Sequence, residues 1–438
     1  MTSEPLLKRT IDRLGLATGL GETIGPEIIR VYFLQFIALA IGMVGNIFVA
    51  RWLGPSEKGL IDLFHVLTSF IQDIGALGFG AGVLYALTFL KAPLPSVHGA
   101  AIAFSVLNGF VTAMLGFALI VQWQGVFPGM PAWTLYLCFA LSPLIYYKLV
   151  WSSLLISLNQ AAAMYRIAVA LAFANLIAIL LLFVTHRLSV NSVFLLTAIT
   201  IAINAFVSLG WLLRRELRLE FNLSILKRSF GQGLIFYAGI VANLLHFKID
   251  QILINHWYGS HEVGLYAVGV RWAELLFLLD SALITASLGR LSVLTEVESV
   301  TLIKQMFRAQ LKISGLAAVA VVVLAYPLVL LLYGRDYQGA ILPMMCLVPG
   351  VLAWSLSKIF STKLNYQSGR GALVTFIAIL GLVINIALNL ILLKILRVGI
   401  VGAAFSSSVS YSAVLLAVWW MSRKSQNKPP VDEVRVAI

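Results

Sequence analysis

Apolar side chains dominate this chain in long uninterrupted runs, which short polar segments separate. A helix needs about 20 apolar residues to cross roughly 30 Å of hydrocarbon at 1.5 Å per residue. Strands of a membrane barrel would instead alternate in polarity over about ten residues. The runs therefore predict an all-α polytopic membrane protein with twelve transmembrane helices. Their approximate ranges are 31–50, 60–85, 98–121, 132–157, 163–184, 190–213, 232–255, 264–288, 309–333, 338–362, 371–393 and 399–421.

Composition agrees with a membrane location. Of 438 residues, 60% are hydrophobic and only 11% are charged, and the mean hydropathy is +0.95. Soluble domains carry about 25% charged residues, and a folded soluble chain could not bury this much apolar surface. Both cysteines, Cys138 and Cys346, fall inside expected helices. We therefore expect no disulfide framework and no thiolate metal site. The sequence shows no other metal-ligand cluster, and we expect no cofactor.

Basic residues are distributed unequally between the two sides of the predicted bundle. Of the 31 Lys and Arg residues, 21 lie on the side of the two termini, 6 on the opposite side and 4 within spans. Because basic loops stay in the cytoplasm, both termini are predicted to be cytoplasmic. The basic residues are scattered over many short loops, which favours contact with anionic membrane lipids and argues against nucleic acid as a partner.

A decapeptide occurs twice, as RWLGPSEKGL at 51–60 and as HWYGSHEVGL at 256–265, with five identical positions. The first copy joins predicted helices 1 and 2, and the second joins helices 7 and 8. An even number of helices intervenes, so both copies face the same side of the membrane. The spacing predicts two six-helix bundles related by a pseudo-two-fold axis along the membrane normal. We interpret each copy as a structural corner, with a gate as the alternative.

The repeat divides the chain into two bundles with three flanking segments. The bundles are expected at 31–213 and 232–421. A cytoplasmic N-terminal segment is expected at 1–30, a cytoplasmic amphipathic linker at 214–231 and a cytoplasmic tail at 422–438.

Several segments resemble bacterial polysaccharide and O-antigen flippases of the multidrug/oligosaccharidyl-lipid/polysaccharide exporter superfamily. ARWLGPSEKGL resembles their first-loop signature, and the run from LLYGRDYQGA through NIALNLILL to RVGIVGAAFSSSVSYS resembles their C-terminal half. The resemblance covers about 31–420. It implies a V-shaped cavity between two bundles, alternating access, and a polyprenyl-pyrophosphate-linked oligosaccharide as cargo. It also implies the bacterial inner membrane, a role in O-antigen or exopolysaccharide synthesis, and polysaccharide polymerase machinery as a further partner.

Polar side chains recur at helical spacing within two predicted helices, one in each bundle. Residues three, four or seven positions apart share a helix face. We predict that these faces line the cavity, where they hydrogen-bond sugar hydroxyls and attract a diphosphate. The alternative is that they bridge packed helices. The residues are Lys148, Ser152 and Asn159 in helix 4, and Lys358, Ser361 and Asn365 in helix 10.

Helices 7 and 8 carry further candidates. Helix 7 is polar on two sides, with His246 and Asp250 on one face and Lys248 on the other, so it should border the cavity. In helix 8, the spacing of Arg271 and Glu274 favours mutual neutralisation. Charged groups inside a membrane are costly and mark functional sites. Candidate substrate contacts are therefore Lys248 and Arg271, and candidates for coupling to H⁺ or Na⁺ are His246, Asp250, Glu274 and Asp280. The alternative for Asp250 is a structural carboxylate hydrogen-bonded to its neighbours.

Three function classes can be compared on these residues. A lipid-linked oligosaccharide flippase is favoured, and a cation-coupled multidrug antiporter of the same superfamily, built on Asp250 or Asp280, is the alternative. A membrane enzyme needs a catalytic pair in a sizeable outer loop. The longest such loop, QWQGVFPGMP, holds no titratable side chain. The chain also lacks the GxxxxGK[ST] phosphate loop, so we predict that it is not an enzyme.

Overall fold

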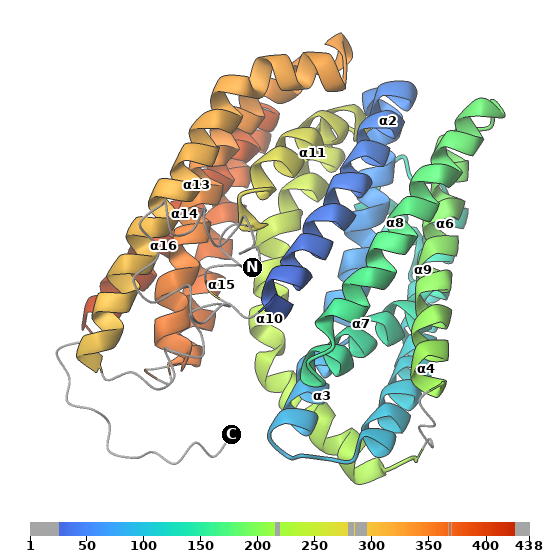
Figure 1. Ribbon diagram of the computed structural model, residues 1–438. Coiled ribbons are helices and arrows are strands. Elements are labelled where there is room, and N and C mark those ends of the chain that lie inside the picture. Colours follow the sequence, from blue (N-terminus) through green and yellow to red (C-terminus); the bar gives the residue numbers. More distant parts are fainter. Residues whose placement is uncertain are drawn as a thin grey trace, which may run out of the picture.

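The computed structural model describes residues 26–214, 220–278, 284, 296–366, 368 and 370–424. These residues form helices and short connections, and no strand occurs among them. Figure 1 shows two groups of long helices that approach each other at one end of the molecule. Within the described ranges, nine helices are long and apolar enough to cross a membrane, and a pair bent by 46° provides a tenth.

The first bundle begins with a helix that contains two spans. Its elements are α2 (Pro26–Phe70), η1 (Ile71–Gly75), α3 (Phe79–Thr88), α4 (Leu94–Ala118), α5 (Ile120–Val126), α6 (Ala132–Ala140), α7 (Ser142–Ser157), α8 (Ala161–Val184) and α9 (Val190–Leu213). The bent pair is α6 and α7, which together form predicted helix 4.

The second bundle repeats this plan. Its elements are α10 (Leu223–Tyr258), α11 (Ser260–Glu274), α13 (Glu296–Leu332), η2 (Arg335–Ala340), α14 (Ile341–Tyr366), α15 (Gly371–Asn389), η3 (Leu390–Ile395) and α16 (Ile400–Lys424). Of the predicted span 264–288, the structure describes residues 264–278 and 284, and α11 forms the first part. Helix α10 already begins at Leu223, so the second half of the expected linker is continuous with helix 7. Residues 215–219 of that linker lie outside the described part.

Each decapeptide forms a sharp corner at a glycine. Gly54 has φ 80° and ψ 173°, and Gly259, the equivalent residue of the second copy, has φ 85° and ψ 176°. Only glycine occupies this backbone region readily. The chain therefore reverses direction at Gly54 inside α2, which separates predicted helices 1 and 2. The matching angles confirm that the two copies are structural equivalents.

The two corners pack against each other. A Cβ atom at Gly59 would lie 2.7 Å from the carbonyl carbon of Ser260, and a Cβ at Gly264 would lie 2.9 Å from that of Pro55. Gly59 and Gly264 occupy equivalent positions in the repeat, as do Pro55 and Ser260. The contact is therefore symmetric about the pseudo-two-fold axis, and small residues allow this close helix approach.

Hydrogen bonds between the bundles accompany this contact. Arg51 donates from Nη1 to the carbonyl of Leu331 (2.8 Å), and the Tyr337 hydroxyl donates to the carbonyl of Ala50 (2.9 Å). Asn255 Nδ2 of the second bundle likewise donates to the carbonyl of Pro128 in the first bundle (3.0 Å). These bonds and the glycine contact hold the two bundles together at the corner end.

Predicted helix 2 is interrupted between the end of α2 at Phe70 and the start of α3 at Phe79. The π-helical turn η1 ends at Gly75, and Gly78 takes a left-handed φ of 74° before α3 begins. Backbone carbonyls inside a membrane must find partners. The Tyr237 hydroxyl donates a hydrogen bond to the carbonyl of Ile74 (3.0 Å). The Asn108 side-chain amide donates one to the carbonyl of Gly75 (2.7 Å). The backbone of α10 at Gly233 packs directly on Gly78, so α10 begins against the first bundle and ends in the second.

Candidate functional site

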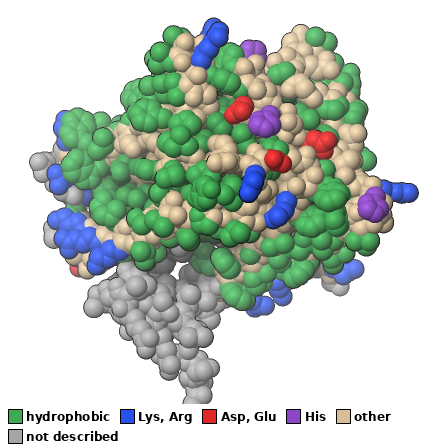
Figure 2. Space-filling model, turned by 90° about the horizontal axis from the view of Figure 1, so that it is seen from above, with side chains coloured by type: hydrophobic (Ala, Val, Ile, Leu, Met, Phe, Trp, Pro, Cys, Tyr) green, Lys and Arg blue, Asp and Glu red, His purple; other side chains and the backbone are tan. Residues whose placement is uncertain are grey.

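A polar cavity lies between the bundles, next to the paired corners. Its volume is about 340 Å³, within the range of small-molecule sites. The second half of α2 forms one wall, and α10 and α11 form the other. The lining residues are Asp62, His65, Val66, Ser69, Lys248, Gln251, Ala267, Val270, Arg271 and Glu274. Seen from the corner end, basic, acidic and histidine side chains gather among a largely apolar surface (Figure 2).

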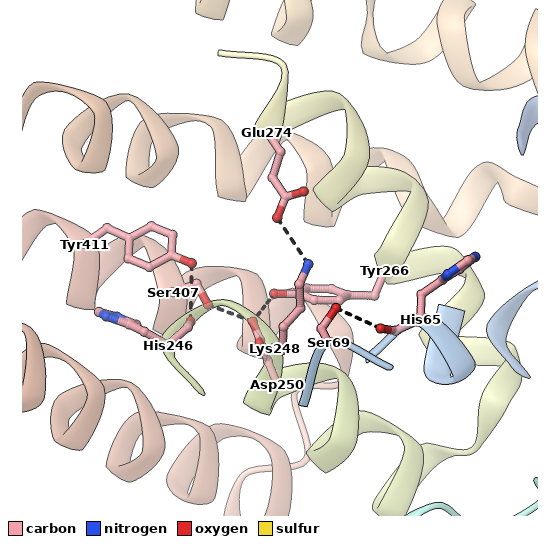
Figure 3. Close-up of polar contacts among 9 residues, drawn as sticks. All are labelled: His65, Ser69, His246, Lys248, Asp250, Tyr266, Glu274, Ser407 and Tyr411. Carbon is pink, nitrogen blue, oxygen red and sulfur yellow. Dashed lines mark hydrogen bonds and ion pairs between the residues drawn. The ribbon is translucent and has the colours of Figure 1, made fainter. Parts of the chain in front are cut away.

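Some charged side chains around this cavity form ion pairs with other described residues, and one does not. Asp62 accepts a hydrogen bond from Lys58, one turn earlier on α2, and both side chains are buried. Lys248 of α10 lies 3.5 Å from a carboxylate oxygen of Glu274 of α11 (Figure 3). Arg271 has no hydrogen bond or ion pair with any residue that the structure describes. Of the two cations in the cavity lining, only Lys248 therefore has an ion-pair partner among the described residues.

The expected pairing within helix 8 is replaced by a pairing between helices. The sequence spacing suggested that Arg271 and Glu274 neutralise each other, and Glu274 instead contacts Lys248. An exposed pair on one helix is worth only a few tenths of a kcal/mol, so a cation from a facing helix can easily displace it. As a result, Arg271 is left without an ion-pair partner among the residues that the structure describes.

Asp250 faces the interior of the second bundle, away from the cavity. Its Oδ2 atom accepts hydrogen bonds from the Tyr266 hydroxyl and from Ser407 (2.9 Å) (Figure 3). His246, one turn earlier, lies 2.9 Å from Ser410 through Nε2. These contacts join α10, α11 and α16 into one buried polar network.

Two asparagines of α15 extend this network. Asn385 donates to Ser407 (3.1 Å), and Asn389 donates to Asn385 (3.1 Å). The buried Oδ1 atoms of Asp250 and Asn389 have no hydrogen-bond partner among the described residues. Buried oxygens normally have a partner, so these atoms are suited to a proton or a small cation.

The first bundle has no equivalent of this network. The residue 205 positions before Asp250 is Gly45 in α2, and a Cβ there would contact the apolar side chains of Ile179 and Leu176. Asn175 of α8 matches Asn385 in position, and it makes a single 3.3 Å hydrogen bond to Thr200. The two bundles therefore share a fold and differ in the polar residues of their interiors.

The residues predicted in helix 4 do not line the cavity described above. Lys148 is half-buried in α7, and among the described residues its side chain has no hydrogen bond or ion pair. The Ser152 hydroxyl donates to the carbonyl of Lys148 (3.0 Å). Asn159 lies beyond the end of α7 with φ 54°, a left-handed conformation common after helix ends. The helical spacing that grouped it with Lys148 therefore does not apply.

The residues predicted in helix 10 share α14, as expected, but they lie outside the cavity lining. Lys358 Nζ sits 4.9 Å from the centre of the Phe277 ring. Ser361 is half-buried, and Asn365 is exposed near the helix end. Their role as substrate contacts stays a prediction. Asp280 lies outside the described residues.

Sequence reasoning missed the α2 wall of the cavity. Asp62, His65 and Ser69 follow each other at spacings of three and four, which places them on one helix face. This polar stripe was visible in predicted helix 2. The decapeptide at 51–60 was interpreted as a structural corner, so its Lys58 was not recognised as the partner of Asp62.

Comparisons with known proteins agree with this architecture. A family model described as "Polysaccharide biosynthesis protein" matches residues 48–342. No curated protein matches the chain. Among solved structures, the lipid II flippase MurJ in an inward closed conformation is similar with a TM-score of 0.75, at 13% identity over 91% of this chain and 89% of that one.

Transporters of the multidrug resistance MATE family, which belongs to the MOP superfamily, are also similar. An inward-facing structure has a TM-score of 0.73 at 15% identity, covering 89% of this chain and 98% of that one. An outward-facing structure has a TM-score of 0.65 at 15% identity, covering 94% and 98%. These likenesses confirm the predicted fold class, and the relatives are transporters, in agreement with the prediction that the chain is not an enzyme. The chain belongs to the polysaccharide biosynthesis protein family and has the fold of MOP-superfamily transporters.

Proposed function

We propose that this protein flips a polyprenyl-pyrophosphate-linked oligosaccharide across the bacterial inner membrane for surface polysaccharide synthesis. The observation that carries the proposal is the polar cavity between the bundles, where Arg271 has no ion-pair partner among the described residues. A cation kept inside a membrane protein is costly, and an anionic headgroup would compensate it. The family match to polysaccharide biosynthesis supports this choice of cargo, as does the likeness to a lipid II flippase.

The cavity offers both kinds of contact that such a headgroup needs. Arg271 and Lys248 would attract the diphosphate, because a guanidinium and an ammonium pair well with phosphate oxygens. Ser69, Gln251 and His65 would hydrogen-bond sugar hydroxyls. The polyprenyl tail would stay in the bilayer while the headgroup crosses between the bundles. Alternating access would come from rocking of one bundle against the other around this site.

We further propose that the Asp250 network couples transport to H⁺ or Na⁺. Asp250 and Asn389 each present a buried oxygen without a described partner. The Ser407 hydroxyl contacts Asp250, and the Asn385 amide contacts Asn389. Oxygen donors of this kind suit small hard cations. The network occurs in the second bundle only, so we expect that bundle to bind the coupling ion.

A test of the cargo site uses Arg271→Gln, with Arg187→Gln as a matched control. Arg187 is exposed in the connection between α8 and α9. In a deletion strain, Arg271→Gln should restore less than about a tenth of the wild-type surface polysaccharide, since losing a buried charge-assisted contact costs about 1.5–3 kcal/mol. Lipid-linked intermediates should accumulate, and immunoblots should show normal protein in the membrane. Full polysaccharide from Arg271→Gln would refute the cavity assignment.

The antiporter alternative is favoured by one observation, the likeness to multidrug MATE transporters. It makes a different prediction for the same deletion strain. Loss of a drug antiporter would raise drug susceptibility and leave surface polysaccharide and its lipid-linked intermediates unchanged.

A further inference from the structure

Two ion pairs of contrasting character border the cavity, among the residues that the structure describes. In the Lys58–Asp62 pair the side chains are only 2% and 7% exposed, and the lysine contacts both carboxylate oxygens. In the Lys248–Glu274 pair the side chains are 25% and 28% exposed, and a single 3.5 Å contact joins them. Separating the first pair would leave a buried charge uncompensated, which is costly. The second pair faces the cavity, and solvent screens it, so it can open at low cost.

Glu274 stands among the cations that a diphosphate would use. It lies one helical turn after Arg271 on α11, and both residues line the cavity. Lys248 approaches from the neighbouring helix α10, which belongs to the same wall of the cavity (Figure 3). An entering anion would therefore compete with Glu274 for Lys248, and it would feel repulsion from Glu274 unless that carboxylate moved away.

We propose that Glu274 is an internal counter-anion, which occupies Lys248 while the cavity is empty and is exchanged for the phosphate groups of the cargo. This inference rests on the proposed function and adds a positioning and specificity role to one residue of the cavity. The exchange replaces one anion on Lys248 by another. The cargo consequently binds Lys248 more weakly than it would bind a lysine without a competing carboxylate. When Glu274 returns to Lys248, it helps to release the cargo after transport.

The exchange has a clear physical benefit for a transporter. A site must bind strongly enough to capture its cargo and weakly enough to release it. Two free cations facing a diphosphate would favour a long-lived complex. A competing carboxylate on the same wall lowers the affinity without removing either cation. It also discriminates against singly charged anions, because only a multiply charged group compensates for the displaced Glu274.

The test measures binding of inorganic pyrophosphate to the purified full-length protein in detergent. Glu274→Gln keeps the size of the side chain and removes the competing charge. We expect it to bind pyrophosphate at least about tenfold more tightly, the effect of about 1.4 kcal/mol, while surface polysaccharide output falls because release slows. Glu262→Gln is the matched control, since Glu262 lies on the same helix but outside the cavity lining. It should bind like wild type.

A double-mutant cycle assigns the effect to the proposed pair. If Glu274 acts by occupying Lys248, Glu274→Gln should tighten binding much less in a Lys248→Gln background. Should Glu274→Gln fail to fold, as judged by thermal melting, Glu274→Ala carries the same expectation.

The outcomes separate this inference from the proposed function. Wild-type binding together with equal or weaker binding by Glu274→Gln overturns the counter-anion role and leaves the proposed function standing. Absence of pyrophosphate binding in wild type and in both Glu274 variants overturns the anion site itself, and with it both proposals. Tighter binding by Glu274→Gln with undiminished polysaccharide output would overturn the release role.

Discussion

The contact between the two decapeptide corners makes a sharp prediction about the conformational equilibrium. In Gly59→Ala, the added Cβ would lie 2.7 Å from the carbonyl carbon of Ser260, whereas ordinary contacts begin at 3.4 Å. The corners must therefore separate by at least about 0.7 Å, the difference between these distances. The atoms that this Cβ would meet, in Ser260 and Gly264, belong to the backbone of a packed helix, so no flexible side chain can absorb the shift.

The magnitude follows from the cost of overpacking. Inserting a methyl group into a well-packed contact costs about 1–3 kcal/mol. If the bundles separate at this end during transport, only the state with joined corners bears the cost. The equilibrium should then shift by about 5- to 150-fold toward the state with separated corners.

The assay measures access to the cavity from the corner end, which the distribution of basic residues predicts to face outside. A cysteine replaces Ser69 in the cavity wall, in a background without Cys138 and Cys346. A membrane-impermeant maleimide is added to intact spheroplasts. Gly59→Ala should raise the labelling rate at least about fivefold, the lower limit of the expected shift, and the equivalent Gly264→Ala should do the same.

The control is Gly42→Ala, another α2 glycine, where a Cβ would contact nothing within 4 Å. It should leave the labelling rate unchanged. Unchanged labelling in both Gly59→Ala and Gly264→Ala, with normal membrane levels of each protein, would show that the corners do not separate during transport. They would then be static structural elements.

Three further predictions concern other parts of the molecule. Neutralising Lys148 and Lys358 together to Gln should abolish surface polysaccharide while the protein stays in the membrane, and normal output would remove both lysines from the transport route. Asp250→Asn should make transport insensitive to collapse of the proton or sodium gradient, measured as accumulation of lipid-linked intermediates; retained sensitivity would dismiss Asp250 as the coupling group. Gly54→Ala should lower stability by about 1–3 kcal/mol, because a non-glycine residue is strained at this φ and ψ, and thermal melting beside Gly42→Ala would measure it; equal melting temperatures would contradict the strain.

Much of the fold could be predicted because its determinants are local. A span requires only length and apolarity, so continuous runs locate the helices even where no tertiary contact is known. The duplicated decapeptide identified two equivalent bundles, and Gly54 and Gly259 carry the same unusual backbone angles. The two polar faces of helix 7 likewise predicted that this helix borders the cavity, and Lys248 of α10 lines it.

Local spacing was insufficient wherever the partner of a side chain comes from another helix. Arg271 and Glu274 have the spacing of an ion pair, yet Lys248 competes for Glu274 from the facing helix. The stripe of α2 residues becomes a cavity wall only because α10 and α11 lie opposite it.

The sequence by itself determined the approximate positions of the described helices and their parallel duplication, because hydrophobic length and repeat spacing are properties of the chain alone. Tertiary structure decided which charges pair and which glycines touch across the axis. These outcomes depend on distances between segments about 200 residues apart, and such distances exist only once the two bundles have packed.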